Sequence, residues 1–147
     1  MTWRPSRHLT VIGLVLIVAT SVISAACAQD VPSRPERFYH ERFCAGLDLK
    51  IRLGLQRRAD CISPTHAIEV DWHDKWKEAI GQALAYSAET ELRPGIVLVC
   101  RSDQAYCLSS SLFVRQTLSH HGVAATLWDC LPIDETLDDC TRWEIAG

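Results

Sequence analysis

Three carboxylates that lie close together in the sequence could hold a divalent cation. Asp60 is followed by Glu69 and then by Asp71. If their two segments pair as a hairpin with Ile62 opposite Ala67, Asp60 lies opposite Glu69 and all three acids share one face. Like charges opposite each other destabilise a sheet, and a cation between them removes that cost. Mg²⁺ is typically held by one or two carboxylates together with waters and phosphate. The pattern therefore predicts a metal site at Asp60, Glu69 and Asp71, and an acidic solvent-facing surface is the alternative.

The helix predicted after these acids adds three polar side chains. At 100° per residue, Lys75, Gln82 and Tyr86 fall within one narrow stripe. Lys75 follows Asp71 by one helical turn, so its amine could reach back over the carboxylates. Gln82 and Tyr86 form an i, i+4 pair at the border of the buried face. Ordinary polarity at a helix edge is the alternative interpretation.

Hydrophobic periodicity predicts the elements that must position these residues. In order, they are a helix over 36–44, short strands over 47–53, 57–62 and 66–72, a helix over 73–90, a strand over 96–100, a helix over 109–121 and a strand over 123–130. The hairpin register also gives a continuous apolar face, made of Ala59, Cys61, Ile68 and Val70. We read the segment 93–95 as a break that ends the long helix. The expected fold is α/β, with a mixed central sheet (a three-strand meander plus β-α-β) flanked by helices.

Together, these motifs resemble the PD-(D/E)XK nuclease superfamily. Asp60, then Glu69-Val70-Asp71, then Gln82-x-x-x-Tyr86 is most similar to its exonuclease-like branch, whose following helix carries Q-x-x-x-Y. The resemblance covers roughly residues 40–130. The same stretch is similar to a group of small exported bacterial proteins of unassigned function.

The resemblance implies a restriction-endonuclease-like core and metal-dependent phosphodiester hydrolysis with Mg²⁺ or Mn²⁺. Asp60 and Glu69 match the metal-binding carboxylates, and Gln82 and Tyr86 match the helix motif that positions the substrate strand or the catalytic residues. The family pattern wants a lysine where this chain has Asp71, and Lys75 is the candidate replacement. Asp71 is then an extra metal ligand or the mark of a lost active site.

Further matches and two competing interpretations accompany this assignment. Glu41 on the first helix is a weak match for a supporting acid, and Arg57 and Arg58 could contact the phosphates of nucleic acid, the expected partner. One alternative is a catalytically inactive nuclease-fold protein that serves as a binding or interaction module in the envelope. Another is a small disulfide scaffold without nuclease ancestry. A serine hydrolase is disfavoured because the serine run at 109–111 has no G-x-S-x-G context.

The N-terminus and the cysteines indicate export. Residues 1–28 have a basic start, an apolar core and a small-x-small ending, which is typical of a secretory signal peptide. We expect a periplasmic or secreted protein with no membrane span after cleavage, and lipidation at Cys27 is the alternative. The remaining chain divides into a nuclease-like domain (29–130) and an acidic tail (131–147). Without Arg4 and Arg7, 13 of the 15 basic side chains remain against 18 acidic ones. This balance does not indicate non-specific nucleic-acid binding.

The exported part contains an even number of cysteines without C-x-x-C spacing, so disulfides are expected and a zinc site is disfavoured. Proximity in the sequence favours three pairs: Cys44–Cys61, Cys100–Cys107 and Cys130–Cys140.

Overall fold

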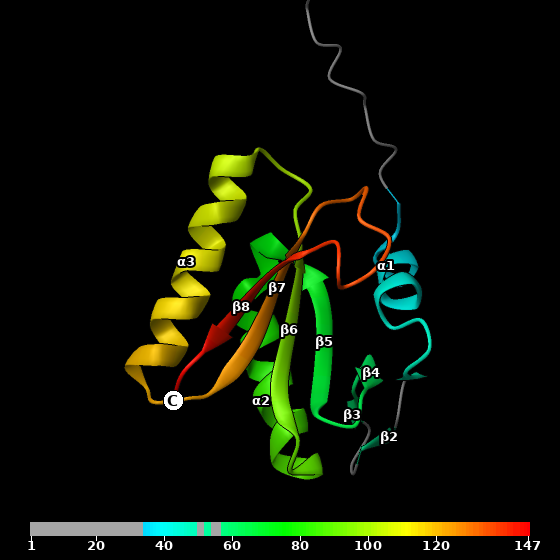
Figure 1. Ribbon diagram of the computed structural model, residues 1–147, viewed down its shortest axis with the longest axis vertical. Helices are drawn as coiled ribbons and strands as arrows, with labels where there is room; N and C mark the ends of the chain where they lie inside the picture. Colours follow the sequence, from blue (N-terminus) through cyan, green and yellow to red (C-terminus); the bar gives the residue numbers. More distant parts are fainter. Residues whose placement is uncertain (1–33, 50–51, 54–56) are drawn as a thin grey trace, which may run out of the picture.

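The computed structural model describes residues 34–49, 52–53 and 57–147. The predicted signal peptide (1–28), with Cys27, lies outside these residues. The described chain is α/β, as expected, with a mixed sheet flanked by helices (Figure 1). Its elements are α1 (Glu36–Phe43), β1 (Asp48–Leu49), β2 (Arg52–Leu53), β3 (Arg57–Arg58), β4 (Cys61–Ile62), β5 (His66–Trp72), a 3-10 turn (His73–Lys75), α2 (Trp76–Thr90), β6 (Arg93–Val99), α3 (Gln104–His120), β7 (Ala125–Cys130) and β8 (Thr141–Ile145).

The main sheet has the strand order β1-β4-β5-β6-β7-β8, and β2 pairs separately with β3. β5, β6 and β7 are parallel and are joined through α2 and α3, whereas β1, β4 and β8 run antiparallel to their neighbours. This is the expected combination of an antiparallel meander with a β-α-β unit. The strand predicted over 57–62 is divided into β3 and β4 by Ala59 and Asp60, while residues 50–51 of the strand predicted over 47–53 lie outside the described residues.

The sheet packs on both of its faces. On one face, α2 and α3 cover a core that includes Ala83, Ile96, Val114 and Leu127. On the other face, α1 packs on a second core, made of Tyr39, Phe43, Cys44, Cys61, Ile68, Val70, Trp72, Val97, Val99, Trp128, Cys130 and Cys140. The apolar run at the end of β6 is typical of a parallel strand that is buried on both sides, whereas β5 also carries the buried acids Glu69 and Asp71.

β6 begins at Arg93, so the prediction that residues 93–95 form a break was wrong. Glu91, in the left-handed conformation with φ 58°, ends α2 instead. Gly95 lies inside the strand for a packing reason. A Cβ there would come within 2.9 Å of Cγ1 of Ile68 and 3.2 Å of Cζ3 of Trp128. The glycine therefore lets these two large side chains meet over the middle of the sheet.

The residues after Cys130 contribute a strand that the sequence analysis did not anticipate. β8 pairs along β7 with Trp143 opposite Leu127, so the acidic segment returns to the sheet. The loop before it lies against α1, where Arg42 donates hydrogen bonds to the carbonyls of Pro132 and Asp134.

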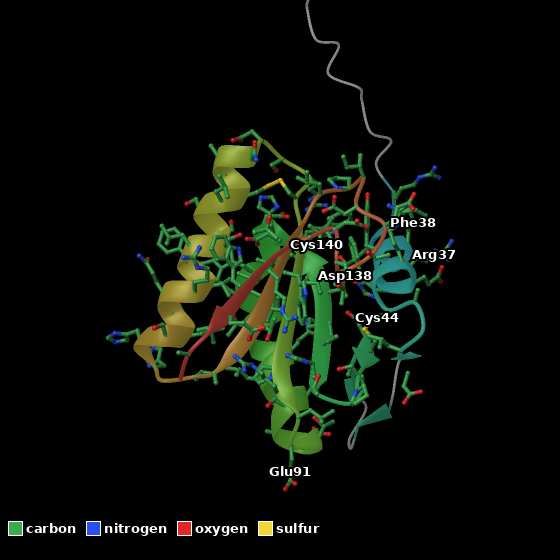
Figure 2. The ribbon with its side chains drawn as sticks, viewed as in Figure 1. Arg37, Phe38, Cys44, Glu91, Asp138 and Cys140 are labelled. Atoms are coloured by element: carbon green, nitrogen blue, oxygen red, sulfur yellow. A yellow bond between two sulfur atoms is a disulfide. The ribbon has the colours of Figure 1, made fainter. Side chains whose placement is uncertain are left out.

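All three expected disulfides are present: Cys44–Cys61, Cys100–Cys107 and Cys130–Cys140. They fit an oxidising environment. Figure 2 shows Cys44 at the end of α1 and Cys140 in the loop that leads into β8. Within the described residues, no helix combines the length and the apolar character that a membrane span requires.

Candidate functional site

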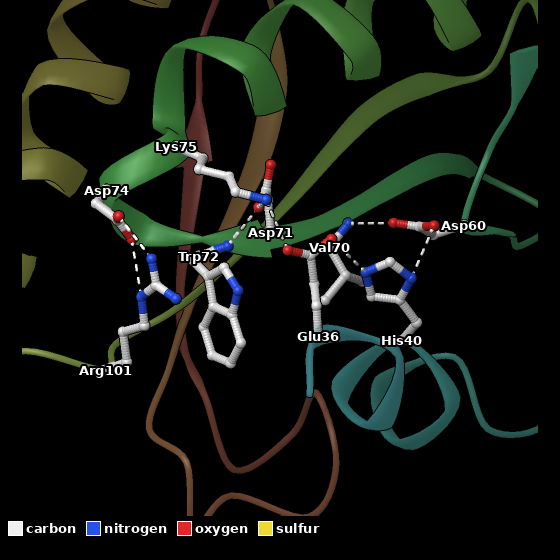
Figure 3. Close-up of polar contacts among 9 residues, drawn as sticks. All are labelled: Glu36, His40, Asp60, Val70, Asp71, Trp72, Asp74, Lys75 and Arg101. Carbon is white, nitrogen blue, oxygen red and sulfur yellow. Dashed lines mark hydrogen bonds and ion pairs between the residues drawn. The ribbon is translucent and has the colours of Figure 1, made fainter. Parts of the chain in front are cut away.

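The candidate site lies where β5 runs beyond its short neighbour β4. Cys61 pairs with Ile68 and Ile62 with Ala67, which confirms the predicted register. β4 begins at Cys61, so this edge of β5 is left without a ladder partner from Glu69 onward among the described residues. Side chains from α1, from the residue before β4 and from the start of α2 gather there instead (Figure 3).

Asp60 occupies a bend immediately before β4. Its Oδ2 accepts a hydrogen bond from the backbone N–H of Val70 at 3.0 Å, so a carboxylate takes the place of a backbone acceptor at the edge of β5. The bend also breaks the alternation of side chains. Ala59 therefore packs with Ala67 and Tyr86 rather than with Cys61, and the prediction that it joins that apolar face was wrong.

The carboxyl group of Glu69 has a strongly raised pKa. Its side chain points to the α2 face of the sheet and is only 5% exposed. Burial, and to a smaller extent the charges of Asp60 and then of Asp71, raise the pKa of Glu69 to about 9. Its Oε2 is buried and has no hydrogen-bond partner. A carboxylate in this position favours a proton or a bound cation, because a buried carboxylate oxygen without a hydrogen bond is costly when it is charged.

Asp71 follows Glu69 by two residues on the same face of β5. The side chain of Lys75 points back toward Asp71. Nζ of Lys75 is 3.3 Å from Oδ1 of Asp71. The same Oδ1 accepts a 2.7 Å hydrogen bond from the backbone N–H of Trp72. Burial raises the pKa of Asp71, although this hydrogen bond and Lys75 oppose the effect. A hydrogen bond to Glu36 is the main reason that the pKa of Lys75 is raised, so this amine is a cation near neutral pH.

Two residues of α1 complete the cluster, and the sequence analysis missed both of them. Nζ of Lys75 donates to Oε2 of Glu36 at 2.7 Å, and Nδ1 of His40 lies 3.0 Å from Oδ1 of Asp60. Nε2 of His40 is 3.6 Å from Oε1 of Glu36. Figure 3 shows this continuous chain from Lys75 through Glu36 and His40 to Asp60. Of the acids on α1, Glu36 contacts this cluster, whereas Glu41, the residue matched in the sequence analysis, is exposed.

The predicted Gln82–Tyr86 pair exists on α2. The hydroxyl of Tyr86 donates to Oε1 of Gln82 at 2.9 Å. Tyr86 is buried against Ala59 and Ala67, which flank Asp60 and Glu69 along the chain, while Gln82 is exposed. The pair thus lies on the α2 side of the sheet, the side that Glu69 and Asp71 face. The side chains of Arg57 and Arg58 lie outside the described part of the structure.

An arginine lies at the rim of the cluster. Arg101, which follows β6, forms a two-pronged pair with Asp74, with Nε–Oδ1 and Nη2–Oδ2 distances of 3.2 and 2.8 Å. Its guanidinium also lies over the ring of Trp72, 4.8 Å from the centroid. A cation fixed in this way next to Lys75 could contact a phosphate group, since its outward N–H groups remain available.

The donor set fits a hard divalent cation. Asp60 and Glu69 interact directly, Glu69 has an uncompensated buried oxygen, and carboxylate oxygens are the ligands that Mg²⁺ and Mn²⁺ prefer. Asp71 would be a further oxygen ligand. The ligand atoms of Asp60, Glu69 and Asp71 do not all come within 4.8 Å of one another; in the described residues the set that does is Cys130, Asp134 and Cys140. It is no thiolate site, because both cysteines belong to one disulfide.

Comparisons with known proteins add no assignment: no family model, no curated protein and no solved structure matches the chain.

Proposed function

We propose that this protein is an exported, metal-dependent phosphodiesterase of the PD-(D/E)XK type, with a restriction-endonuclease-like core and nucleic acid as its substrate class. One observation carries the proposal. The buried Oε2 of Glu69 has no partner, although it lies beside Asp60 and on the face that Lys75 closes. This arrangement is costly for a merely structural acid and suits a metal ligand.

In this proposal Asp60 and Glu69 hold Mg²⁺ or Mn²⁺, and Asp71 is an additional ligand. The bound ion would supply a polarised phosphate oxygen and a water of lowered pKa. Asp60 is fixed for this role by two contacts, with the N–H of Val70 and with His40. Glu69 gives up its proton when the ion is bound, so metal affinity increases with pH up to about 9, where its own pKa lies.

In this proposal Lys75 replaces the catalytic lysine that the PD-(D/E)XK pattern has at the position of Asp71. Its pKa is raised, so it acts as a fixed positive charge and not as a base. From the end of the 3-10 turn that precedes α2 it stabilises the charge that develops on the attacked phosphate. Glu36 and Asp71 hold its amine from two sides, which fixes its position before substrate arrives. Tyr86 and Gln82 support the wall of the site on the α2 side.

The decisive experiment is a nuclease assay on the purified exported chain. Labelled single- and double-stranded DNA and RNA are incubated with Mg²⁺, with Mn²⁺ or with EDTA. We expect cleavage that requires the metal and is lost in Asp60→Asn and in Glu69→Gln. Glu41→Gln, the same kind of change at an exposed position of α1, is the matched control and should keep full activity. Cleavage that persists in both site variants would contradict the proposal.

The observed ion pairs favour a second candidate, an inactive nuclease-fold module that binds a partner in the envelope. His40 and Lys75 already contact Asp60, Glu36 and Asp71, so much of the acidic charge is compensated within the protein. This candidate predicts no cleavage under any metal condition. It also predicts no metal-induced increase in the thermal unfolding temperature, whereas an active site should be stabilised by its ion.

A further inference from the structure

A small cavity lies at the carboxyl ends of β6 and β7, away from the acidic cluster at β5. It has a volume of about 110 Å³ and is bounded by the ends of these two strands, by the N-terminal half of α3 and by the start of β8. Open α/β sheets bind ligands outside the carboxyl ends of their strands, so the position of the cavity suits a ligand.

Asp129 places a carboxylate in this cavity. Its Oδ2 accepts a hydrogen bond from the indole N–H of Trp143 at 2.7 Å, and its Oδ1 accepts one from the hydroxyl of Ser111. Both donors are neutral, and no basic side chain of the described residues forms an ion pair with Asp129. Burial raises the pKa of Asp129, although the two hydrogen bonds oppose the effect. The carboxylate is therefore fixed in position, while its charge has no cationic partner.

The walls of the cavity are apolar and are held by disulfides. Leu108 of α3 and Leu131 after β7 line it and are 55% and 42% exposed, so they form an open apolar lip. Cys100–Cys107 ties the end of β6 to α3, and Cys130–Cys140 ties the end of β7 to the start of β8. A pocket with walls fixed in this way needs little ordering when a ligand binds.

The surroundings of the cavity are acidic. The loop that joins β7 to β8 carries four acids and no basic residue: Asp134, Glu135, Asp138 and Asp139. Asp103, at the start of α3, adds a further negative charge. Two arginines lie nearby, but Arg101 is paired with Asp74, and Arg115 is held over the ring of Trp143, 3.9 Å from its centroid. A surface of this charge attracts cations and repels anions.

We propose that this cavity binds the ammonium end of an aliphatic amine, with Asp129 as its charge partner and with Leu108 and Leu131 along its carbon chain. A volume of about 110 Å³ equals that of about four water molecules, which leaves room for an ammonium group and a short run of methylene groups. An ammonium has three N–H donors, and Gln104 and Thr141, which also line the cavity, offer side-chain oxygens in addition to Asp129. A free amine and the lysine side chain of a partner protein present this same chemistry.

The amine cavity and the nuclease cluster share no residue. Asp71 on β5 pairs with Leu98 on β6, and Leu98 pairs with Asp129 on β7, so the two acids lie two strands apart. Figure 1 shows the end of β7 between α3 and β8, whereas the cluster at β5 lies toward α1. Amine binding is measured without metal or nucleic acid, so its loss and the loss of cleavage are distinguishable.

Titration of the isotope-labelled exported chain with n-butylamine, followed by NMR at about pH 8, tests the cavity, because an aliphatic amine is still protonated at this pH. We expect saturable shifts of the indole N–H signal of Trp143 with a Kd of about 1 mM, a typical scale for a ligand of so few atoms. n-Butanol, which has the same chain without the charge, should bind at least about 10-fold more weakly. Butyrate should not bind.

Two variants test the role of Asp129. Asp129→Asn removes the charge and nearly keeps the shape, so it should weaken n-butylamine binding at least about 10-fold. Leu108→Lys places an ammonium at the exposed lip, one helical turn before Ser111, and should block the cavity from within the chain. Leu112→Lys puts the same charge on another exposed position of α3 and is the matched control, which should bind like the native chain. Circular dichroism confirms that each variant is folded.

A parallel titration with Nα-acetyl-lysine methylamide distinguishes the two sources of the ammonium. Binding at least as tight as that of n-butylamine indicates the lysine side chain of a partner, and weaker binding indicates a free amine. No shift of the Trp143 signal up to about 50 mM n-butylamine would overturn the proposal, since the expected Kd lies far below this concentration. Equal binding of n-butanol, or native affinity in folded Asp129→Asn and Leu108→Lys, would overturn it as well.

Discussion

Nζ of Lys75 lies 3.3 Å from Oδ1 of Asp71, one helical turn earlier in the chain. A lysine in the 3-10 turn before α2 thus reaches the end of β5, where the nuclease pattern of the proposed function has a lysine on the strand itself. Glu36 of α1 holds the same amine at 2.7 Å. The acidic cluster therefore includes a positive charge next to Asp71, supplied from the 3-10 turn before α2.

Replacement of Lys75 should separate catalysis from metal binding. We expect Lys75→Gln to lower kcat about 10²–10³-fold, the usual cost of losing one fixed group that stabilises developing charge. Lys75→Arg keeps the charge and should retain more activity than Lys75→Gln. Metal affinity, measured by calorimetry, should change little in either variant. Full activity of Lys75→Gln would show that another cation, such as Arg101, serves the site.

Replacement of Glu69 should change how stability depends on pH. The pKa of Glu69 is about 9 in the folded chain and near 4.5 when unfolded, so the folded state retains a proton that the unfolded state releases. Stability is therefore greatest below about pH 4.5 with respect to this group and decreases as pH rises toward 9. In Glu69→Gln we expect a flatter pH profile and a higher unfolding temperature at pH 8.

The matched control for this measurement is Glu78→Gln, the same change at an exposed position of α2. Its profile should follow that of the native chain. Addition of Mg²⁺ or Mn²⁺ at pH 8 should stabilise the native chain and the control but not Glu69→Gln. Equal pH profiles in all three proteins would mean that Glu69 ionises normally.

Removal of His40 should weaken the link between α1 and the bend at Asp60. The 3.0 Å contact between these side chains is largely buried, so we expect His40→Ala to lower the free energy of unfolding by about 1–2 kcal/mol. His120→Ala, at the exposed end of α3, is the control and should change it by less than about 0.5 kcal/mol. Chemical denaturation measures both values. Equal effects would show that the His40–Asp60 contact contributes nothing to stability.

The sequence predicted those parts of the site that depend on local pattern. The register of β4 and β5 follows from their apolar residues, and the Gln82–Tyr86 contact follows from helical spacing. Glu36 and His40 could not be placed in the same way, because helical periodicity on α1 does not show which polar side faces the sheet. Their i, i+4 spacing and the Cys44–Cys61 pair were the available signals.

The fold was predictable to a similar degree. β5 has the predicted bounds because a segment that alternates apolar residues with Glu69 and Asp71 follows turn residues, whereas β8 was missed within an acidic segment. Its signal was the alternation of Arg142 and Glu144 with Trp143 and Ile145, which is typical of a half-exposed edge strand. Pairing with β7 supplied the stability that this short segment lacks on its own.

The Cys44–Cys61 disulfide should be needed for the site as well as for stability. Cys44 follows α1, one turn after His40, and Cys61 directly follows Asp60, so this bond joins the two segments that meet at the cluster. In the double variant Cys44→Ala/Cys61→Ala we expect a loss of about 3 kcal/mol in the free energy of unfolding, as for a closed loop of this size. Activity and metal affinity, measured well below the unfolding transition, should also fall, because α1 is no longer fixed against β4. The control is Cys100→Ala/Cys107→Ala, which removes a disulfide beside α3 and should cost stability while leaving metal affinity nearly unchanged. If both double variants lost metal affinity equally at the same folded fraction, the Cys44–Cys61 bond would have no specific part in holding the site.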